Sequence, residues 1–596
     1  MRRFVRELSS DQIARAGLLL ALIVLCTITW RKWGYLPVDV GRELYVPAAM
    51  AEGKRLYFDL WYSYGPLIPY WHAALFRLFG VHLGLLLGSG IAVVAITATL
   101  LYSVGRMFLP VWLAYTAVFA FLVQAFQLNL FNYVLPYSYA ADYGALFSVL
   151  TAWLLLRYVK EPRLGYIVPA AFLACLMMLT KLEFGVAGYV AVGCALTTQL
   201  IRTKSTRGLM EGLGACIAGA LIWLGIYGWY VHAGGAEFFL GENLTILPNS
   251  YFVAHFGKRW AEGLGMVFTP SVLLLSVLKG FLSFALLVGG IVLAARHRLA
   301  RWFVPAVALA MCTTALLPPA VLRMVHQDPE NAHRAIGFVW FNSGMFWISV
   351  AGLGAAAVAW RRGDDPMKQQ STIVLGAMAM FCSLRVFTKI APERYPVFYD
   401  TLLYLVWLVA LYGMSKWFGV SLDGVAGRAV AGILCISLVA STLPNYPIGQ
   451  RPSKISSERG TIYAATPFGE YFSQVVAFME SAKQRSERVV VMPEDTALYF
   501  FSGTSAPSRW YLVMPHLLAP GEATAKYIDE LERANIRYVI VSDRATPEYG
   551  LPVFGIDYAQ QVLAWVHEHY RVVQRIGDYE AVAHPREWGV LIYERK

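Results

Sequence analysis

Charged side chains are scarce in this sequence: they make up 15% of its 596 residues, while hydrophobic side chains make up 58%. An average soluble domain carries about 25% charged residues, and a soluble core has no use for so much apolar material. Apolar runs of about 18 residues or more recur along most of the chain, and each can cross a hydrocarbon layer of about 30 Å as a helix. We therefore predict a mainly α, polytopic membrane protein with about thirteen transmembrane helices.

Cysteine is also sparse. The seven cysteines all fall in apolar segments, and none of them belongs to a CxxC pair. This distribution argues against a disulfide framework and against a cysteine zinc site. The formal net charge is +12, but lysine and arginine are dispersed through short connections instead of forming one basic face. We attribute this charge to membrane topology and expect no nucleic-acid partner.

The polar connections predict the orientation. Four of them, at 157–163, 202–207, 295–301 and 360–368, are basic, as cytoplasmic connections usually are. We therefore place the N-terminus in the cytoplasm, and an odd number of spans then puts the C-terminal region outside. The predicted spans are 13–31, 82–104, 108–127, 139–157, 165–181, 184–201, 210–232, 269–295, 303–322, 336–359, 371–388, 397–415 and 426–443.

Residues 445–596 differ in character from the transmembrane region, 1–444. β-rich runs at 488–492 and 537–542 alternate with helix-like stretches, which predicts a soluble α/β domain on the outer side. The region contains no GxGxxG sequence, P-loop or His/Cys cluster. We expect this domain to have a structural or acceptor-docking role.

Ionisable residues gather on the predicted outer side, and among them are Lys181, Arg385 and Lys389. Positive charge there opposes the insertion bias and costs a few kcal/mol unless it is paired or lines a wet cavity. These residues indicate an outward-facing polar chamber. Lys181 could instead simply pair with Glu183, and Arg385 could bridge to a neighbouring helix. The His/Asp/Glu group at 326–333 lacks a recognised zinc-site spacing, so we interpret it as a solvated loop.

The segment 32–80 is the first predicted outer loop. Its prolines and glycines predict short, ordered helices lying on the membrane, and its many tyrosines and tryptophans have the composition of an interfacial aromatic belt. The loop contains the isolated carboxylates Asp39 and Asp59. Glu43 follows Asp39 by four residues, so the two can share a helix face, and Arg42 can pair with either. Interfacial solvation and salt bridges would also explain these acids.

The order of residues in this loop resembles that of a known family. It runs Asp39, Glu43-Leu44-Tyr45, Glu52-Gly53, Tyr57-Phe58-Asp59, Gly65-Pro66-Leu67 and Pro69-Tyr70-Trp71. This order is similar to the first outer loop of the family C (GT-C fold) polyprenyl-phosphate-sugar-dependent glycosyltransferases. Their members include the protein O-mannosyltransferases and the lipid A aminoarabinose transferase. The plan of many spans followed by an outer domain extends the resemblance in outline over the chain.

The resemblance implies a membrane glycosyltransferase that moves a sugar from a polyprenyl-phosphate donor to an acceptor hydroxyl on the outer face. In that family an acid soon after the first span lies at the active site, and by order Asp39 is this acid and Asp59 the second one. Glu43 is the other candidate base, because Gly41-Arg42-Glu43 stands where relatives have adjacent acids. Asp59 would orient the acceptor, tune the first carboxylate or help to hold a divalent metal ion, if one is used.

Glycosyl transfer from a lipid phosphate requires a base for the acceptor hydroxyl and cations for the departing phosphate. We assign the cations to Lys181, Arg385 and Lys389, which are predicted to lie near the outer leaflet, where a polyprenyl phosphate headgroup would sit. The residues assigned to the substrate loop are Tyr57, Tyr64, Pro66, Tyr70 and His72.

Two other functions would use the same residues: a transporter or flippase of a lipid-linked sugar, and a glycan polymerase or ligase. Transporters often carry repeated halves and polar residues at mid-membrane, whereas here the charges gather at one side. The family implies a bacterial inner membrane with a periplasmic C-terminal domain. The expected partners are a polyprenyl-phosphate-linked sugar, membrane lipids and a lipid, glycan or protein acceptor. The sequence leaves open which sugar and acceptor are used, and whether a metal is needed.

Overall fold

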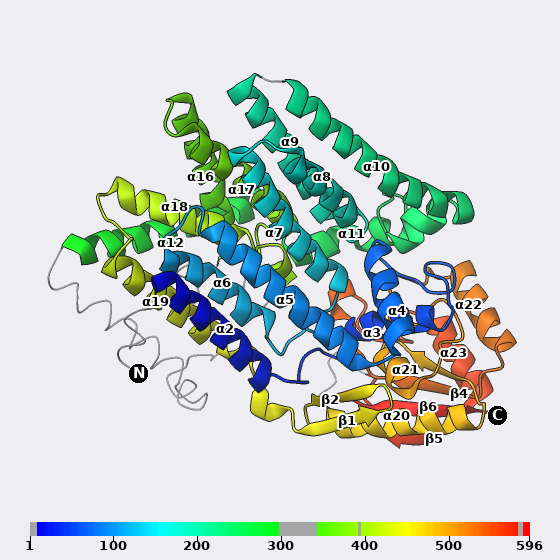
Figure 1. Ribbon diagram of the computed structural model, residues 1–596. Helices are drawn as coiled ribbons and strands as arrows, with labels where there is room; N and C mark the ends of the chain where they lie inside the picture. Colours follow the sequence, from blue (N-terminus) through cyan, green and yellow to red (C-terminus); the bar gives the residue numbers. More distant parts are fainter. Residues whose placement is uncertain (1–8, 205, 297–341, 391–394, 582–587) are drawn as a thin grey trace.

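The computed structural model describes residues 9–204, 206–296, 342–390, 395–581 and 588–596. Figure 1 shows a large set of helices and a smaller C-terminal region that contains the strands. Helices α3 (Val40–Ala51) and α4 (Leu67–Phe79) come from the first outer loop, and α3 packs against α21 (Ala497–Ser502) of the C-terminal region. The first loop therefore joins the two parts of the molecule.

Eight helices in the described part of the chain are long and apolar enough to cross a membrane. The multi-pass architecture is thus confirmed, although length and composition support these eight spans and not the full set of about thirteen. The eight are α2 (Ser10–Ile28), α5 (Leu83–Gly105), α7 (Tyr139–Lys160), α9 (Leu182–Thr203), α10 (Thr206–Gly234), α12 (Pro270–Arg296), α16 (Gly344–Arg361) and α19 (Val425–Thr442).

The remaining predicted spans coincide with helices that are shorter or more polar, except for 303–322, which lies outside the described residues. These helices pack against α7, α9, α16 and α19, so the longer helices surround much of their surface. They are α6 (Val111–Ala125), α8 (Leu164–Met178), α17 (Pro366–Ser383) and α18 (Leu403–Trp417). The connections hold η1 (Glu237–Asn243), α11 (Tyr251–Leu264), η2 (Tyr395–Phe398), η3 (Leu443–Asn445) and η4 (Ile448–Gln450).

Helix α3 and several tyrosines of the first outer loop are buried and do not lie on a surface as expected. Residues 40–50 of α3 are all buried, and Tyr45, Tyr57 and Tyr62 each expose 1% or less. The interpretation of these side chains as an interfacial belt is therefore wrong. They form a core between the helices and the C-terminal region, where the Tyr45 ring lies 5.2 Å from that of Tyr499. Interfacial and buried aromatic residues have the same composition, which is why the sequence did not separate them.

The C-terminal region contains two sheets and flanking helices, as its β-rich runs predicted. β1 and β2 form an antiparallel pair, and the second sheet has the order β3-β4-β6-β5. In that sheet β3 and β4 are parallel, while β6 runs antiparallel to β4 and β5. The strands are β1 (Ser453–Ser457), β2 (Gly460–Ala464), β3 (Val489–Met492), β4 (Tyr538–Ser542), β5 (Tyr570–Ile576) and β6 (Val590–Arg595). The helices are α20 (Phe468–Gln484), α22 (Glu522–Arg533), η5 (Pro547–Tyr549) and α23 (Gln560–His569).

Gly41 allows the close approach of α3 to α21. A Cβ atom at Gly41 would overlap the hydroxyl of Thr496 and the backbone nitrogen of Ala497. We expect Gly41→Ala to lower the free energy of unfolding by about 1–3 kcal/mol, measured by thermal unfolding in detergent. Gly88→Ala on α5 is the control, because a Cβ there meets nothing within 4 Å. Equal stability of the two variants would contradict close packing of α3 on α21.

Candidate active site

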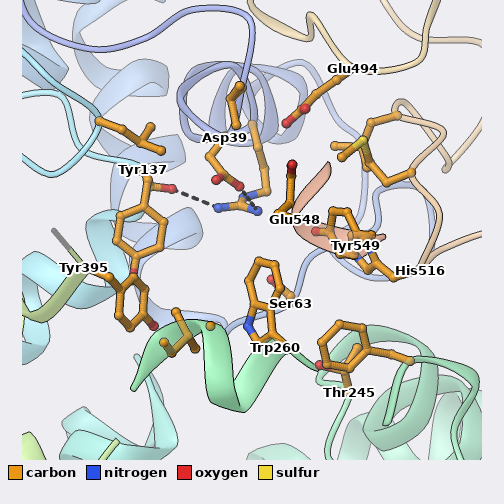
Figure 2. A pocket seen from close by; sticks show the side chains of 18 of the residues that line it. Asp39, Ser63, Tyr137, Thr245, Trp260, Tyr395, Glu494, His516, Glu548 and Tyr549 are labelled. Carbon is orange, nitrogen blue, oxygen red and sulfur yellow. Dashed lines mark hydrogen bonds and ion pairs between the residues drawn. The ribbon is translucent and has the colours of Figure 1, made fainter. Parts of the chain in front are cut away.

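A cavity of about 1230 Å³ lies where the first loop, the helix ends and the C-terminal region meet. Figure 2 shows side chains from these parts of the chain turned toward one space. Its ionisable lining is balanced, with equal numbers of acidic and basic residues. The acidic residues are Asp39, Glu183, Glu262, Glu494, Asp543 and Glu548, and the basic residues are Arg42, Lys181, Arg259, Arg385, Lys389 and Arg544.

Arg42 holds the two candidate bases in different environments. Its Nη1 lies 2.9 Å from Oδ1 of Asp39, and its Nε lies 3.2 Å from Oε1 of Glu43. The Asp39 side chain is 30% exposed and lines the cavity, whereas the Glu43 side chain is 3% exposed and lies outside the lining. Glu43 also accepts a hydrogen bond from the backbone N–H of Tyr139, and burial raises its pKa. Of the two candidate bases, Asp39 is thus the one that faces the cavity.

Lys181 and Arg385 both interact with the carboxylate of Glu183. Lys181 Nζ donates hydrogen bonds to the hydroxyls of Tyr137 and Tyr395, at 2.9 and 3.0 Å, and lies 3.8 Å from Oε1 of Glu183. Arg385 forms an ion pair with the same Glu183 carboxylate. Both alternatives considered for these cations, a local pair and a bridge to another helix, are therefore present. Both cations nevertheless line the cavity.

Lys389 also lines the cavity, but it is held by backbone carbonyls. Its Nζ donates a hydrogen bond to the backbone carbonyl of Gly263 at 3.2 Å, at the end of α11. No acidic side chain pairs with Lys389 among the described residues, so its charge is met by carbonyl dipoles. Within the described part of the chain, an anion in the cavity would therefore meet no carboxylate already paired with this ammonium group.

Two tyrosines connect the acidic side of the site to the basic side. The Tyr64 ring centroid lies 5.1 Å from the guanidinium carbon of Arg42 and 4.6 Å from Lys181 Nζ. Arg42 Nη2 donates a hydrogen bond to the backbone carbonyl of Tyr137 at 2.8 Å, while Lys181 binds the hydroxyl of the same tyrosine. Asp39 and the cations therefore belong to one connected arrangement.

The C-terminal region supplies ionisable residues that the sequence analysis did not assign. Glu494 follows strand β3, Asp543 and Arg544 follow strand β4, and all three line the cavity. Because β3 and β4 are parallel, their carboxyl ends meet at one edge of the sheet, where open α/β sheets place their ligand sites. The available signal was the presence of acidic residues directly after two β-rich runs.

These carboxyl groups have shifted pKa values. Burial raises the pKa of Glu494 to about 8, and the nearby Asp39 carboxylate acts in the same direction. Arg544, whose Nε lies 3.0 Å from Oε2 of Glu494, opposes this shift. Burial also raises the pKa of Asp543 to about 6. Carboxyl groups that titrate near neutral pH are suited to exchange protons with a substrate or with water.

Asp59 and most of the assigned substrate-loop residues lie outside the cavity lining. Asp59 pairs with Arg55, whose Nη2 lies 3.0 Å from its Oδ1. Tyr57 donates a hydrogen bond to the backbone carbonyl of Tyr64 at 2.6 Å, and Pro66 precedes α4 as its N-cap. Tyr64 itself lines the cavity. The structure thus separates Asp59 from the site that Asp39 forms.

Tyr70 and His72 lie on α4, away from the cavity. The Tyr70 side chain is 48% exposed, and its hydroxyl lies 3.4 Å from that of Tyr230. His72 is 2% exposed, and its ring centroid lies 4.6 Å from that of Tyr139. These two residues support the packing of the loop against the neighbouring helices.

The described residues contain no group of three or more His, Cys, Asp or Glu side chains placed to hold a metal ion. In that part of the chain, Asp59 therefore has no set of partner ligands for the divalent ion considered from the sequence. The histidines and acids at 326–333 lie outside the described residues.

No family model matches this chain, and no curated protein sequence matches it. Solved structures match it along nearly its whole length. One is the archaeal oligosaccharyltransferase AglB from Archaeoglobus fulgidus in complex with an inhibitory peptide and a dolichol-phosphate. Its TM-score is 0.42 at 12% identity, and the alignment covers 96% of this chain and 75% of that one.

Another is ArnT from Cupriavidus metallidurans. Its apo structure matches with a TM-score of 0.41 at 13% identity, covering 97% of this chain and 98% of that one. Its structure bound to undecaprenyl phosphate gives 0.39 at 12% identity, covering 97% of each chain. These are glycosyltransferases of the GT-C fold. At such scores the likeness concerns the course of the chain and assigns no role to any residue.

Proposed function

We propose that this protein is a membrane glycosyltransferase that moves a sugar from a polyprenyl-phosphate donor to an acceptor hydroxyl. The observation that carries the proposal is one cavity that combines a facing carboxylate, Asp39, with three cations, Lys181, Arg385 and Lys389. A reaction that deprotonates a hydroxyl and releases a phosphate requires both kinds of group in one site.

In the proposed reaction the Asp39 carboxylate takes the proton of the acceptor hydroxyl. The acceptor oxygen then forms a bond with the anomeric carbon of the donor sugar, and the bond from that carbon to the phosphate oxygen breaks. The bonding electrons leave with the polyprenyl phosphate. Exposure favours Asp39 over Glu43, because both oxygens of Glu43 already accept hydrogen bonds inside the protein.

Lys181, Arg385 and Lys389 would bind the departing phosphate. Arg385 keeps 31% of its side chain exposed, so its guanidinium can bind phosphate oxygens while one nitrogen remains on Glu183. Lys181 is 3% exposed and surrounded by tyrosines, so it acts as a fixed charge. Lys181 is the N-cap of α9 and Arg385 follows the C-terminal end of α17. In the proposed orientation both would lie near the headgroups of the outer leaflet.

The connections of the helices support an outward-facing cavity. The basic connections at 157–163, 202–207 and 360–368 lie at the opposite ends of α8, α9 and α17 from the cavity residues. If the positive-inside rule holds, these connections are cytoplasmic and the cavity faces out. We accordingly propose a bacterial inner membrane with the C-terminal region on its periplasmic side.

The direct test reconstitutes the purified protein with radiolabelled polyprenyl-phosphate sugars and membrane acceptors. We expect the label to become covalently attached to an acceptor, with release of polyprenyl phosphate. Movement of intact donor across the bilayer without release of polyprenyl phosphate would contradict the proposal and favour a transporter.

Asp39→Asn removes the proposed base but keeps the size of the side chain. We expect transfer to fall by about 100-fold or more, the usual effect of losing a general base, while expression and membrane insertion are retained. Thermal stability should fall moderately, because Arg42 loses one of its two charged partners. Asp59→Asn is the matched control and should retain transfer, because Asp59 pairs with Arg55 away from the cavity. Normal transfer by Asp39→Asn in proteoliposomes would refute the assignment.

Arg385→Ala tests phosphate binding. We expect the KM for the donor to rise by about 10-fold, with the acceptor KM nearly unchanged, because a charge-assisted hydrogen bond is lost. Glu183→Gln breaks the same ion pair but keeps the cation, so it should raise the donor KM less. If both variants change donor and acceptor kinetics equally, Arg385 is a structural bridge between helices.

A further inference from the structure

One side of the cavity is aromatic. We call it the aromatic wall, and it consists of Trp61, Phe252, Trp260, His516 and Tyr549, all of which line the cavity. The ring centroids of Trp260 and Tyr549 lie 5.4 Å apart with planes inclined by 14°, and those of His516 and Tyr549 lie 4.6 Å apart with planes inclined by 16°. Three nearly parallel rings from distant parts of the chain therefore form one stack.

Trp260 of the aromatic wall lines the cavity between its two sides. Figure 2 shows its indole projecting into the cavity, with Tyr549 and His516 on one side and Tyr137 and Tyr395 on the other. Tyr137 and Tyr395 bind Lys181, which belongs to the proposed phosphate site. The aromatic wall thus stands opposite the side that the donor phosphate would occupy.

Arg259 fixes the aromatic wall in place. Its Nε and Nη2 donate hydrogen bonds to the backbone carbonyls of Glu548 and Pro547, at 3.0 and 2.9 Å. These bonds join α11 to the C-terminal region and hold Trp260 against Tyr549. A ligand that binds to rings held in this way loses little free energy to the ordering of side chains.

Polar groups adjoin the aromatic wall. Arg544 pairs with Glu494, at 3.0 Å, and also with Glu548. The Glu548 side chain is 37% exposed, so its carboxylate can accept hydrogen bonds from a ligand. The wall therefore presents a flat apolar surface beside a carboxylate and a guanidinium group.

We propose that the aromatic wall is the acceptor subsite and that the acceptor is a saccharide, so that the transferred sugar is attached to a carbohydrate hydroxyl. This inference rests on the proposed glycosyltransferase function. A pyranose ring has a face of C–H groups that packs on an indole and a rim of hydroxyls that bond to carboxylates and guanidinium groups. An alkyl alcohol would displace water from these charged groups without offering hydrogen bonds in return, which is costly.

The chemical class of the product tests the inference. Membranes that contain the protein are incubated with radiolabelled polyprenyl-phosphate sugar, and the labelled product is analysed by glycosidic linkage analysis and by β-elimination. We expect the label in a glycosidic bond to another sugar, stable to β-elimination. Label released from serine or threonine, or attached to an alkyl alcohol, would overturn the saccharide acceptor while leaving the glycosyltransferase function intact. Absence of any polyprenyl phosphate release would refute the function itself.

Trp260→Ala tests the stacking surface. We expect the KM for the acceptor to rise by about 10-fold and the donor KM to change by less than about 2-fold, because an aromatic contact with one substrate is lost. Trp260→Phe should restore part of the acceptor affinity. Trp417→Ala, at a residue 81% exposed, is the matched control and should leave both constants unchanged. Equal changes in the donor and acceptor KM for Trp260→Ala would contradict an acceptor subsite.

Discussion

The buried guanidinium of Arg42 is the interaction on which the rest of the site depends. It is 5% exposed, pairs with Asp39 and Glu43, bonds the Tyr137 carbonyl and lies over the Tyr64 ring. Removing a partner from such a buried charge costs several kcal/mol, so the surrounding groups hold one another in position. This single side chain orients the carboxylate that faces the cavity. It also joins the first loop to Tyr137, whose hydroxyl accepts a hydrogen bond from Lys181.

The sequence predicted the parts of the fold that depend on local pattern. Apolar length identified the membrane helices, and β-rich runs located β3 and β4. It did not predict the burial of the first loop, because the partners of that loop lie far along the chain: Ala506 N donates to the Tyr45 hydroxyl across 461 residues. The prolines and tyrosines of a buried loop have the same local pattern as those of an interfacial one.

In the candidate site, too, the sequence predicted the residues that carry a local signal and missed those that depend on distant contacts. Lys181, Arg385 and Lys389 were found because charge at the end of an apolar segment is costly, and they do line one cavity. Glu494 and Arg544 were missed because acids and arginines in a polar domain carry no such signal. What distinguishes them is the parallel pairing of β3 and β4, which brings 492 and 541 side by side. Sequence order alone also could not reveal that Arg55 holds Asp59 away from the cavity.

The contact of the first loop with the C-terminal region has a consequence for biosynthesis. The Tyr511 hydroxyl donates a hydrogen bond to the backbone carbonyl of Trp61. Trp61 is synthesised 450 residues before Tyr511. At a translation rate of about 5–20 residues per second, the loop waits roughly 20–90 s for this partner. During that time its aromatic side chains and Arg42 lack the surroundings they have in the finished protein. The cavity therefore forms only after the C-terminal region has been synthesised, because that region supplies part of its lining.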